Sequence, residues 1–222
     1  MSDGSLSLPA RLYLLAWDTE RPRLTGTAHL HHLVRAGALT ELAQRGLLVD
    51  DDGITTPVDL DAHTGDPVLD GLLELVRESR PRRWRAWVTL RARYTLVAVR
   101  EQLAAEGYLR AEKRRVLGIF PSVEHALQRV AAVDALQREA RGVLEGDRPA
   151  VEVSERDAAV VALAAAAELR TLVPGKDRRR HRRRIEELTE RSGAAAPALR
   201  RVVREVRTAV VVAATAASAP AG

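Results

Sequence analysis

The most constraining feature of this sequence is one apolar segment, residues 157–173, composed largely of alanine, valine and leucine. Ser154 precedes the segment and can cap a helix, whereas Pro174 and Gly175 follow it and end one. A helix that is apolar on nearly every side must be surrounded by other parts of the chain, so it usually lies at the centre of a core. The sequence therefore predicts a helical core built around this segment.

The composition supports a core made of helices. Hydrophobic residues make up 46% of the 222 residues and aromatic residues only 3%, so leucine, valine and alanine must fill the interior. These residues suit helix interfaces, and a charged fraction of 29% is typical of a folded chain. No shift in composition marks a domain boundary. We therefore expect one globular, mostly α-helical domain over residues 8–217 with two or more short β-hairpins, and flexible ends at 1–7 and 218–222.

A pattern of helix, glycine, strand, turn and strand occurs twice, in ELAQRGLLVDDDGITT (41–56) and EQLAAEGYLRAEKRRVLGIF (101–120). In each copy the glycine ends the helix and polar residues form the turn. Gly37 is a candidate break in the helix that precedes the first hairpin, at 27–45. Other helices are expected at 9–17, 82–91, 94–106, 122–144 and 176–191, after Pro67 and after Pro197.

Helical spacing identifies the inward faces and the starts of individual helices. Leu96, Val99 and Leu103 recur at three- and four-residue intervals and are expected to face the core. The sequence TGD at 64–66 offers a side-chain cap directly before Pro67, which suits the first turn of a helix.

Positive charge is concentrated in two segments of a chain whose formal net charge is only +5. Residues 77–115 carry 12 basic and 4 acidic side chains, and residues 176–207 carry 12 and 5, so their net charges are +8 and +7. The rest of the chain has 11 basic and 21 acidic side chains, a net charge of −10. Two cationic segments on an anionic body indicate a polyanionic partner, such as membrane headgroups, nucleic acid or an acidic protein.

Each cationic segment also has a purely structural interpretation. Arginines around Trp84 and Trp87 suit an interface in which guanidinium groups bind phosphate and an indole lies at headgroup depth. The same arginines could form a solvated helix face. The run RRRHRRR at 178–184 precedes EELTE, so ion pairs between residues four apart can neutralise part of it.

Nothing in the sequence indicates catalysis or a bound cofactor. Glycine-rich nucleotide-binding motifs, G-x-S-x-G and H-E-x-x-H do not occur, and the absence of cysteine excludes thiolate ligands and disulfides. We expect no enzymatic activity, cofactor or metal, and we expect His29, His31 and His32 to be surface or half-buried residues. Every apolar run is far shorter than the roughly 20 residues that span a bilayer, so any membrane contact is expected to be peripheral.

Five stretches follow one another in a recognisable order: LTELAQRGLL (39–48), TGDPVLDGLLELV (64–76), VREQLAAEGYLRAEK (99–113), VLGIFPS (116–122) and the apolar C-terminal helix. In this order they resemble the Golgi phosphoprotein 3 family of peripheral membrane proteins, which bind phosphatidylinositol 4-phosphate. The resemblance covers about residues 8–215. It implies a single, mostly helical domain with short hairpins, a basic face that docks to anionic membrane, and no enzymatic activity.

The resemblance also implies individual site residues. The family holds the lipid headgroup with one tryptophan and three arginines, and two of these arginines match Arg35 and Arg100 here. Val97 stands at the third arginine position, and the tryptophan position falls near Gly26. Candidate substitutes from the neighbouring basic segment are Trp84, Trp87, Arg91 and Arg93. The family's exposed hairpin, implicated in membrane contact and self-association, corresponds to about 109–120, with the apolar residues Leu117, Ile119 and Phe120.

Together these features predict a peripheral membrane-binding protein that recognises anionic phospholipid headgroups similar to phosphatidylinositol 4-phosphate and acts as an adaptor or scaffold. Its expected partners are an anionic membrane surface and, through the hairpin, a second copy of itself. The arginine-rich composition and the lack of an N-terminal extension indicate a bacterial member, cytoplasmic and peripherally membrane-associated.

Two other functions compete with this prediction. A helix followed by a hairpin, as in 41–56, is also the profile of a winged-helix nucleic-acid-binding protein. Asp50, Asp51 and Asp52 argue against it, because they would repel DNA where the wing should touch it. The other competing function is a scaffold whose basic faces meet an acidic protein.

Overall fold

The chain folds into helices connected by three small antiparallel sheets. The structure, a computed structural model, describes residues 6–116, 120–175 and 177–193 together with Val202, Val206 and Thr208. The helices are α1 (Leu8–Leu15), α2 (Leu30–Gln44), α3 (Pro67–Glu78), α4 (Trp84–Thr89), α5 (Ala92–Ala105), α6 (Val130–Glu145), η1 (Ala150–Glu152), α7 (Glu155–Ala166) and α8 (Arg182–Ser192). The strands are β1 (Trp17–Asp18), β2 (Arg23–Leu24), β3 (Leu48–Asp51), β4 (Ile54–Pro57), β5 (Arg82–Arg83), β6 (Leu109–Val116) and β7 (Phe120–Leu127).

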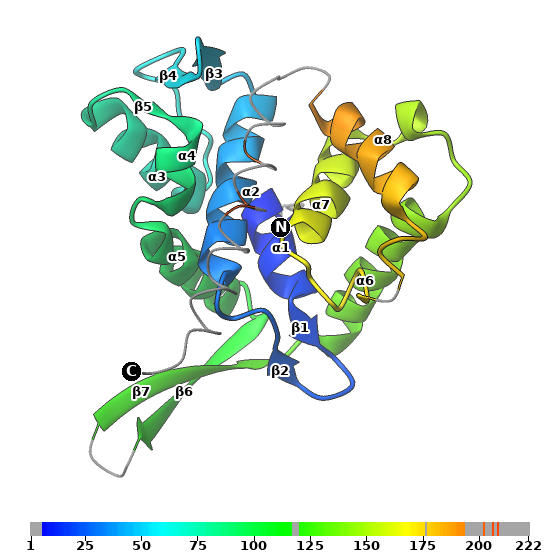
Figure 1. Ribbon diagram of the computed structural model, residues 1–222. Helices are drawn as coiled ribbons and strands as arrows, with labels where there is room; N and C mark the ends of the chain where they lie inside the picture. The colour runs from blue at the N-terminus through cyan, green and yellow to red at the C-terminus, as the bar shows by residue number, and fades with distance from the viewer. Residues whose placement is uncertain are drawn as a thin grey trace, which may run out of the picture.

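The helices α1, α2 and α7 form the centre of the molecule. Figure 1 shows them in the middle, with α3, α4 and α5 on one side and α6 and α8 on the other. Every residue from Leu33 to Ala43 in α2 is buried, and so is every residue from Ala158 to Ala166 in α7. The predicted single, mostly α-helical domain with short hairpins is confirmed, although α2 shares the central position that the sequence indicated for residues 157–173.

The central helix α7 ends earlier than its apolar sequence predicts. Glu168 has φ 53°, in the left-handed region, and its N–H donates to Ala165 O at 3.2 Å while Leu169 N donates to Ala164 O at 2.9 Å. These are the two hydrogen bonds of a Schellman cap, whose left-handed residue is usually glycine. Because glutamate occupies that position here, no residue before Pro174 signals the end of the helix, and Leu172 and Val173 remain buried beyond it.

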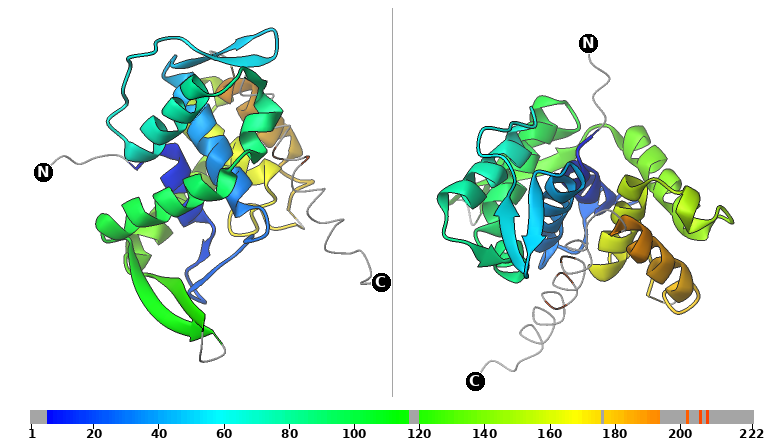
Figure 2. Two further views of the ribbon diagram at one scale, coloured as in Figure 1. Left: turned by 90° about the vertical axis from the view of Figure 1, so that its left-hand side faces the viewer. Right: turned by 90° about the horizontal axis from the view of Figure 1, so that it is seen from above.

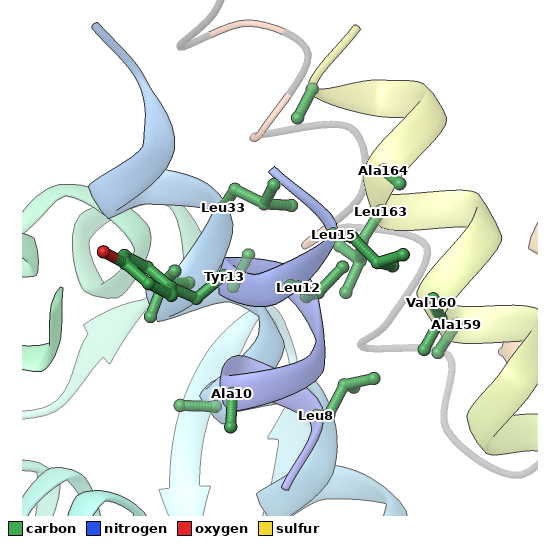
Figure 3. Packing of buried hydrophobic residues seen from close by; sticks show 14 of the residues in the cluster. Leu8, Ala10, Leu12, Tyr13, Leu15, Leu33, Ala159, Val160, Leu163 and Ala164 are labelled. Atoms are coloured by element: carbon green, nitrogen blue, oxygen red, sulfur yellow. The ribbon is translucent and has the colours of Figure 1, made fainter. Parts of the chain in front are cut away.

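Gly37 lets α1 and α2 approach each other closely. A Cβ atom on Gly37 would lie 2.6 Å from Leu12 Cδ1 and 3.2 Å from the backbone of Pro9. The predicted break at Gly37 is therefore wrong: α2 continues through this position, and the glycine provides space for α1. Figure 3 shows the result, with Leu12 and Leu15 of α1 lying between α2 and Leu163 of α7.

Glu41 of α2 fixes the start of α1. Its Oε2 accepts the backbone N–H of Leu8, the first residue of α1, at 2.6 Å, and its Oε1 accepts from Arg45 Nη2 at 2.5 Å. The carboxylate is buried, and it satisfies one of the N–H groups that a helix leaves without a partner at its first turn. A carboxylate at this position also interacts favourably with the positive end of the helix dipole.

Both predicted hairpins are present, but the second is longer than predicted, and its expected turn at Lys113 and Arg114 is wrong because β6 continues through both residues. β3 pairs with β4, and β5 adds a third strand to that sheet through Ile54↔Arg83 and Thr55↔Arg82. β6 pairs with β7 from Leu109↔Leu127 to Val116↔Phe120. The helix predicted at 122–144 therefore begins only at α6, because its first residues complete the strand β7. The predicted cap before α3 is confirmed, since Asp66 accepts from the backbone N–H groups of Val68 and Leu69.

We expect opposite effects from the same substitution at two helical glycines. Gly37→Ala lowers the free energy of unfolding by about 1–3 kcal/mol, because the added methyl group overpacks the contact with α1. Gly71→Ala in α3, where a Cβ meets nothing within 4 Å, raises it by about 0.5–1 kcal/mol through helix propensity. Urea denaturation measures both. Equal effects at the two sites would show that the close approach at Gly37 does not constrain the fold.

Candidate functional site

Five arginines make an exposed basic surface around α4, which we call the arginine surface. They are Arg80, Arg82, Arg83, Arg91 and Arg93. They lie before α4, in β5, and at the start of α5, so α4, about 9 Å long, separates the two groups. All five side chains are exposed, and within the described residues none of them has an ion-pair partner. This part of the 77–115 segment therefore presents uncompensated positive charge.

In the described part of the second cationic segment, several arginines already have partners within the fold. In α8, Arg182 pairs with Glu186 at 3.3 Å and Arg183 with Glu187 at 3.0 Å, which confirms the predicted pairing between residues four apart. Other arginines of the segment hold α8 to the rest of the molecule: Arg184 donates to Val143 O, Arg191 to Val153 O and Glu155, and Arg178 to Glu168. Arg179 and Arg180 remain exposed before α8.

Arg35 lies in the core beneath the arginine surface. It is 1% exposed, and its Nη2 donates to the backbone carbonyl of Arg91 at 2.9 Å. That carbonyl belongs to a residue with φ 50°, directly before α5. Within the part of the chain that the structure describes, Nε and Nη1 of Arg35 have no hydrogen-bond partner. Burial lowers the pKa of Arg35 to about 10, so the guanidinium stays charged at neutral pH.

Arg100 lies farther along α5 and is half-buried. Its guanidinium carbon is 5.6 Å from the centroid of the Tyr13 ring, at cation–π distance. Burial raises the pKa of the Tyr13 hydroxyl, and the positive charge of Arg100 opposes that rise. The arginine therefore connects α5 to the buried face of α1.

Arg35 and Arg100 contact different parts of the molecule. Arg35 bonds to the residue before α5, and Arg100 follows that residue by nine positions, about 13 Å along the helix. No described contact joins the two side chains. Their role in lipid binding stays a prediction.

The pocket between β1, β2, α6 and the end of α7 contains neither arginine. It has a volume of about 1640 Å³. Its charged lining consists of Arg23, Arg138, Arg141, Arg170, Asp18, Glu20, Asp134 and Glu168, with His29 beside them. The positive and negative side chains balance, so this pocket has no net attraction for an anion.

The two candidate tryptophans face the core. Trp84 is 1% exposed and Trp87 is fully buried, so their indoles do not lie at headgroup depth as the sequence suggested. The short helix α4 packs against α2, which is why its apolar residues point inward. Leu117 and Ile119 lie outside the described residues, and of Phe120 only the backbone, as the first residue of β7, is described.

Two residues of α5 that the sequence analysis did not predict to be exposed apolar residues lie beside the arginines that precede them. Tyr94 is 73% exposed and Val97 is 49% exposed. Leu96, Val99 and Leu103 are buried as predicted, and this orientation of α5 leaves Tyr94 and Val97 on the opposite face. The helical spacing that predicted the inward face of α5 therefore also predicts which residues lie on its outward face.

The histidine cluster borders the same region at the start of α2. The rings of His31 and His32 are 4.0 Å apart, and burial lowers the pKa of both, that of His32 to about 4. The charge of Arg93 lowers both values further. Among the described residues, no group of three or more histidine, aspartate or glutamate side chains could hold a metal ion.

The comparison with protein families identifies one match. The sequence model of the family described as Golgi phosphoprotein 3 (GPP34) matches residues 8–206. No curated protein matches the chain. Over the described residues, none of the helices combines the length and the apolar character needed to cross a membrane.

We expect acid to destabilise the protein through His32. Below about pH 6.5 the unfolded chain protonates this histidine, whereas the folded protein keeps it neutral down to a pKa of about 4. Unfolding then takes up a proton, so the free energy of unfolding falls as the pH falls through this window. At pH 5 the loss is about 1–2 kcal/mol, allowing for partial exposure of the ring.

Urea denaturation of the wild type and of His32→Gln at pH 7 and pH 5 measures this loss. The variant should lose less stability than the wild type between these two values. His63→Gln, at an exposed histidine, is the control and should behave as the wild type does. The same loss in the wild type and in His32→Gln would contradict the prediction.

Proposed function

The chain belongs to the Golgi phosphoprotein 3 family, and from this membership we propose that it is a peripheral membrane-binding protein. It recognises anionic phospholipid headgroups, similar to phosphatidylinositol 4-phosphate, through a basic face and serves as an adaptor or scaffold without enzymatic activity. The proposal places the membrane-facing side at α4 and the start of α5.

The arginine surface is the observation that carries the proposal. Its five guanidinium groups are exposed and lack carboxylate partners among the described residues, so an external anion can bind them. Each basic residue near an anionic membrane contributes about 1 kcal/mol, and a few of them are sufficient for reversible docking. The basic run before and within α8 is a weaker candidate, because most of its arginines already bind carboxylates or carbonyls.

Arg35 supports recognition of a phosphate rather than of general negative charge. A buried guanidinium with two unpartnered nitrogens is costly, since its desolvation is compensated by a single hydrogen bond to Arg91 O. A phosphate oxygen that reached this position would accept the missing hydrogen bonds. Opening of the segment around Arg91 would give a headgroup that access.

Vesicle co-sedimentation tests the basic face. We expect the wild type to bind phosphatidylcholine vesicles that contain phosphatidylinositol 4-phosphate or phosphatidylserine and not vesicles of phosphatidylcholine alone. Arg83→Gln/Arg93→Gln removes two charges of the arginine surface and should weaken binding about 10- to 30-fold. The matched control Arg179→Gln/Arg180→Gln removes the same charge near α8 and should have a smaller effect.

Three results would contradict the proposal. They are equal binding to neutral and anionic vesicles, no binding to either, and a larger loss of vesicle binding in the α8 control variant than in the arginine-surface variant.

A mobility-shift assay with duplex DNA at modest salt tests the competing nucleic-acid function. Tight, sequence-selective retardation would favour DNA as the partner.

The role of Arg35 is tested by headgroup preference at constant surface charge. Vesicles containing phosphatidylinositol 4-phosphate are compared with vesicles that contain more phosphatidylserine and carry the same net charge. Arg35→Gln should reduce a preference for the phosphoinositide about tenfold or more, because charge-assisted hydrogen bonds are lost. Arg35→Lys keeps the buried positive charge but lacks the planar guanidinium group with its several N–H donors, so its preference for the phosphoinositide should be intermediate. An unchanged preference in both variants would exclude Arg35 from headgroup recognition.

A further inference from the structure

The exposed face of α5 carries two apolar side chains within one turn of each other. Tyr94 and Val97 are 73% and 49% exposed, whereas Leu96 and Val99 of the same helix are buried. Single exposed apolar residues are ordinary on a protein surface. Tyr94 and Val97, however, lie three residues apart, so they form one continuous strip along the outer side of α5.

This strip has positive charge at its start and a carboxylate, Glu101, after its end. Arg91 and Arg93 lie immediately before Tyr94 and are exposed members of the arginine surface. Arg100, one turn after Val97, is half-buried, and Glu101 is the first exposed carboxylate along this helix. In the left view of Figure 2, α4 and α5 lie on the side of the molecule that faces the viewer.

We propose that Tyr94 and Val97 insert into the interfacial region of an anionic bilayer while Arg91 and Arg93 bind lipid phosphates; this rests on the membrane-binding function proposed above. A tyrosine ring has an apolar body and a polar tip, and it is therefore enriched at the level of the headgroups. Val97 lies one turn farther and adds apolar area. Apolar burial and electrostatic attraction then act together, as in surface-bound amphipathic helices.

The partner follows from charge complementarity. The border of the strip at its start is cationic, and the described carboxylates nearest to it in sequence lie beyond Val97. An anionic partner is therefore favoured. A fluid bilayer adapts to an exposed helix face.

The buried native tryptophans make this insertion directly measurable. Trp17, Trp84 and Trp87 are the three tryptophans of the chain, and they are at most 3% exposed. Tyr94→Trp therefore adds the one indole that can enter a membrane from this face. With vesicles of phosphatidylcholine and phosphatidylserine, its emission should shift to shorter wavelength, and lipids brominated on the acyl chain should quench it. Phosphatidylcholine vesicles alone should cause neither change.

Val151→Trp is the matched control, because Val151 is 78% exposed in η1, away from α5 in sequence and in the fold. Its emission should not change when vesicles are added. As a second measurement, Val97→Ser should lower the partition coefficient of the otherwise unmodified chain for anionic vesicles about three- to tenfold through lost apolar burial. The corresponding Val151→Ser should leave it unchanged.

The possible results separate this inference from the function on which it rests. If Tyr94→Trp sediments with anionic vesicles but shows neither the shift nor the quenching, the inference is wrong and the membrane-binding function stands. If Val151→Trp responds equally, insertion is not localised to α5 and the inference is also wrong. If neither the wild type nor Tyr94→Trp sediments with anionic vesicles, the membrane-binding function fails, and the inference fails with it.

Discussion

The close contact between α1 and α2 is the constraint on which the rest of the structure depends. It requires a residue without a Cβ atom at Gly37, because Pro9 and Leu12 of α1 occupy that space. One turn later Glu41 accepts the first backbone N–H of α1, so the two helices are joined by shape and by a buried charge-assisted hydrogen bond. With α1 held there, α7 packs on α1 and α2, and α4 and α5 pack against α2.

The position of the basic surface follows from that arrangement. Trp84 and Trp87 bury their indoles and thereby fix α4, so the arginines on either side of this helix point outward from a rigid base. Arg35 belongs to the same packing, because its hydrogen bond to Arg91 O ties α2 to the chain entering α5. A core residue and an exposed surface are thus connected through one hydrogen bond.

Formal charge alone does not describe the electrostatic environment of the two cationic segments. The two cationic segments have nearly equal net charge, yet their environments differ. Arginines 182 to 184 and 191 find glutamates or carbonyls on α8 and its neighbours, whereas those around α4 have no ion-pair partner among the described residues. An ion pair with a neighbouring carboxylate cancels most of the local electrostatic field of an arginine. The distribution of carboxylate partners, and not the net charge of a segment, therefore determines where positive charge remains uncompensated.

The sequence by itself determined the features that depend on neighbouring residues: a mostly helical domain, two hairpins after helix-ending glycines, the cap at Asp66 and the inward face of α5. The tertiary structure alone decided which helices touch. Gly37 is a contact and not a break, Arg35 is buried, Trp84 and Trp87 point inward, and residues up to Leu127 complete a strand. Helix propensity and hydrophobic periodicity are properties of a few consecutive residues, so they can be read from the sequence. The burial of a side chain depends on which distant helices and strands pack against it, and the order of residues in one sequence does not specify those contacts.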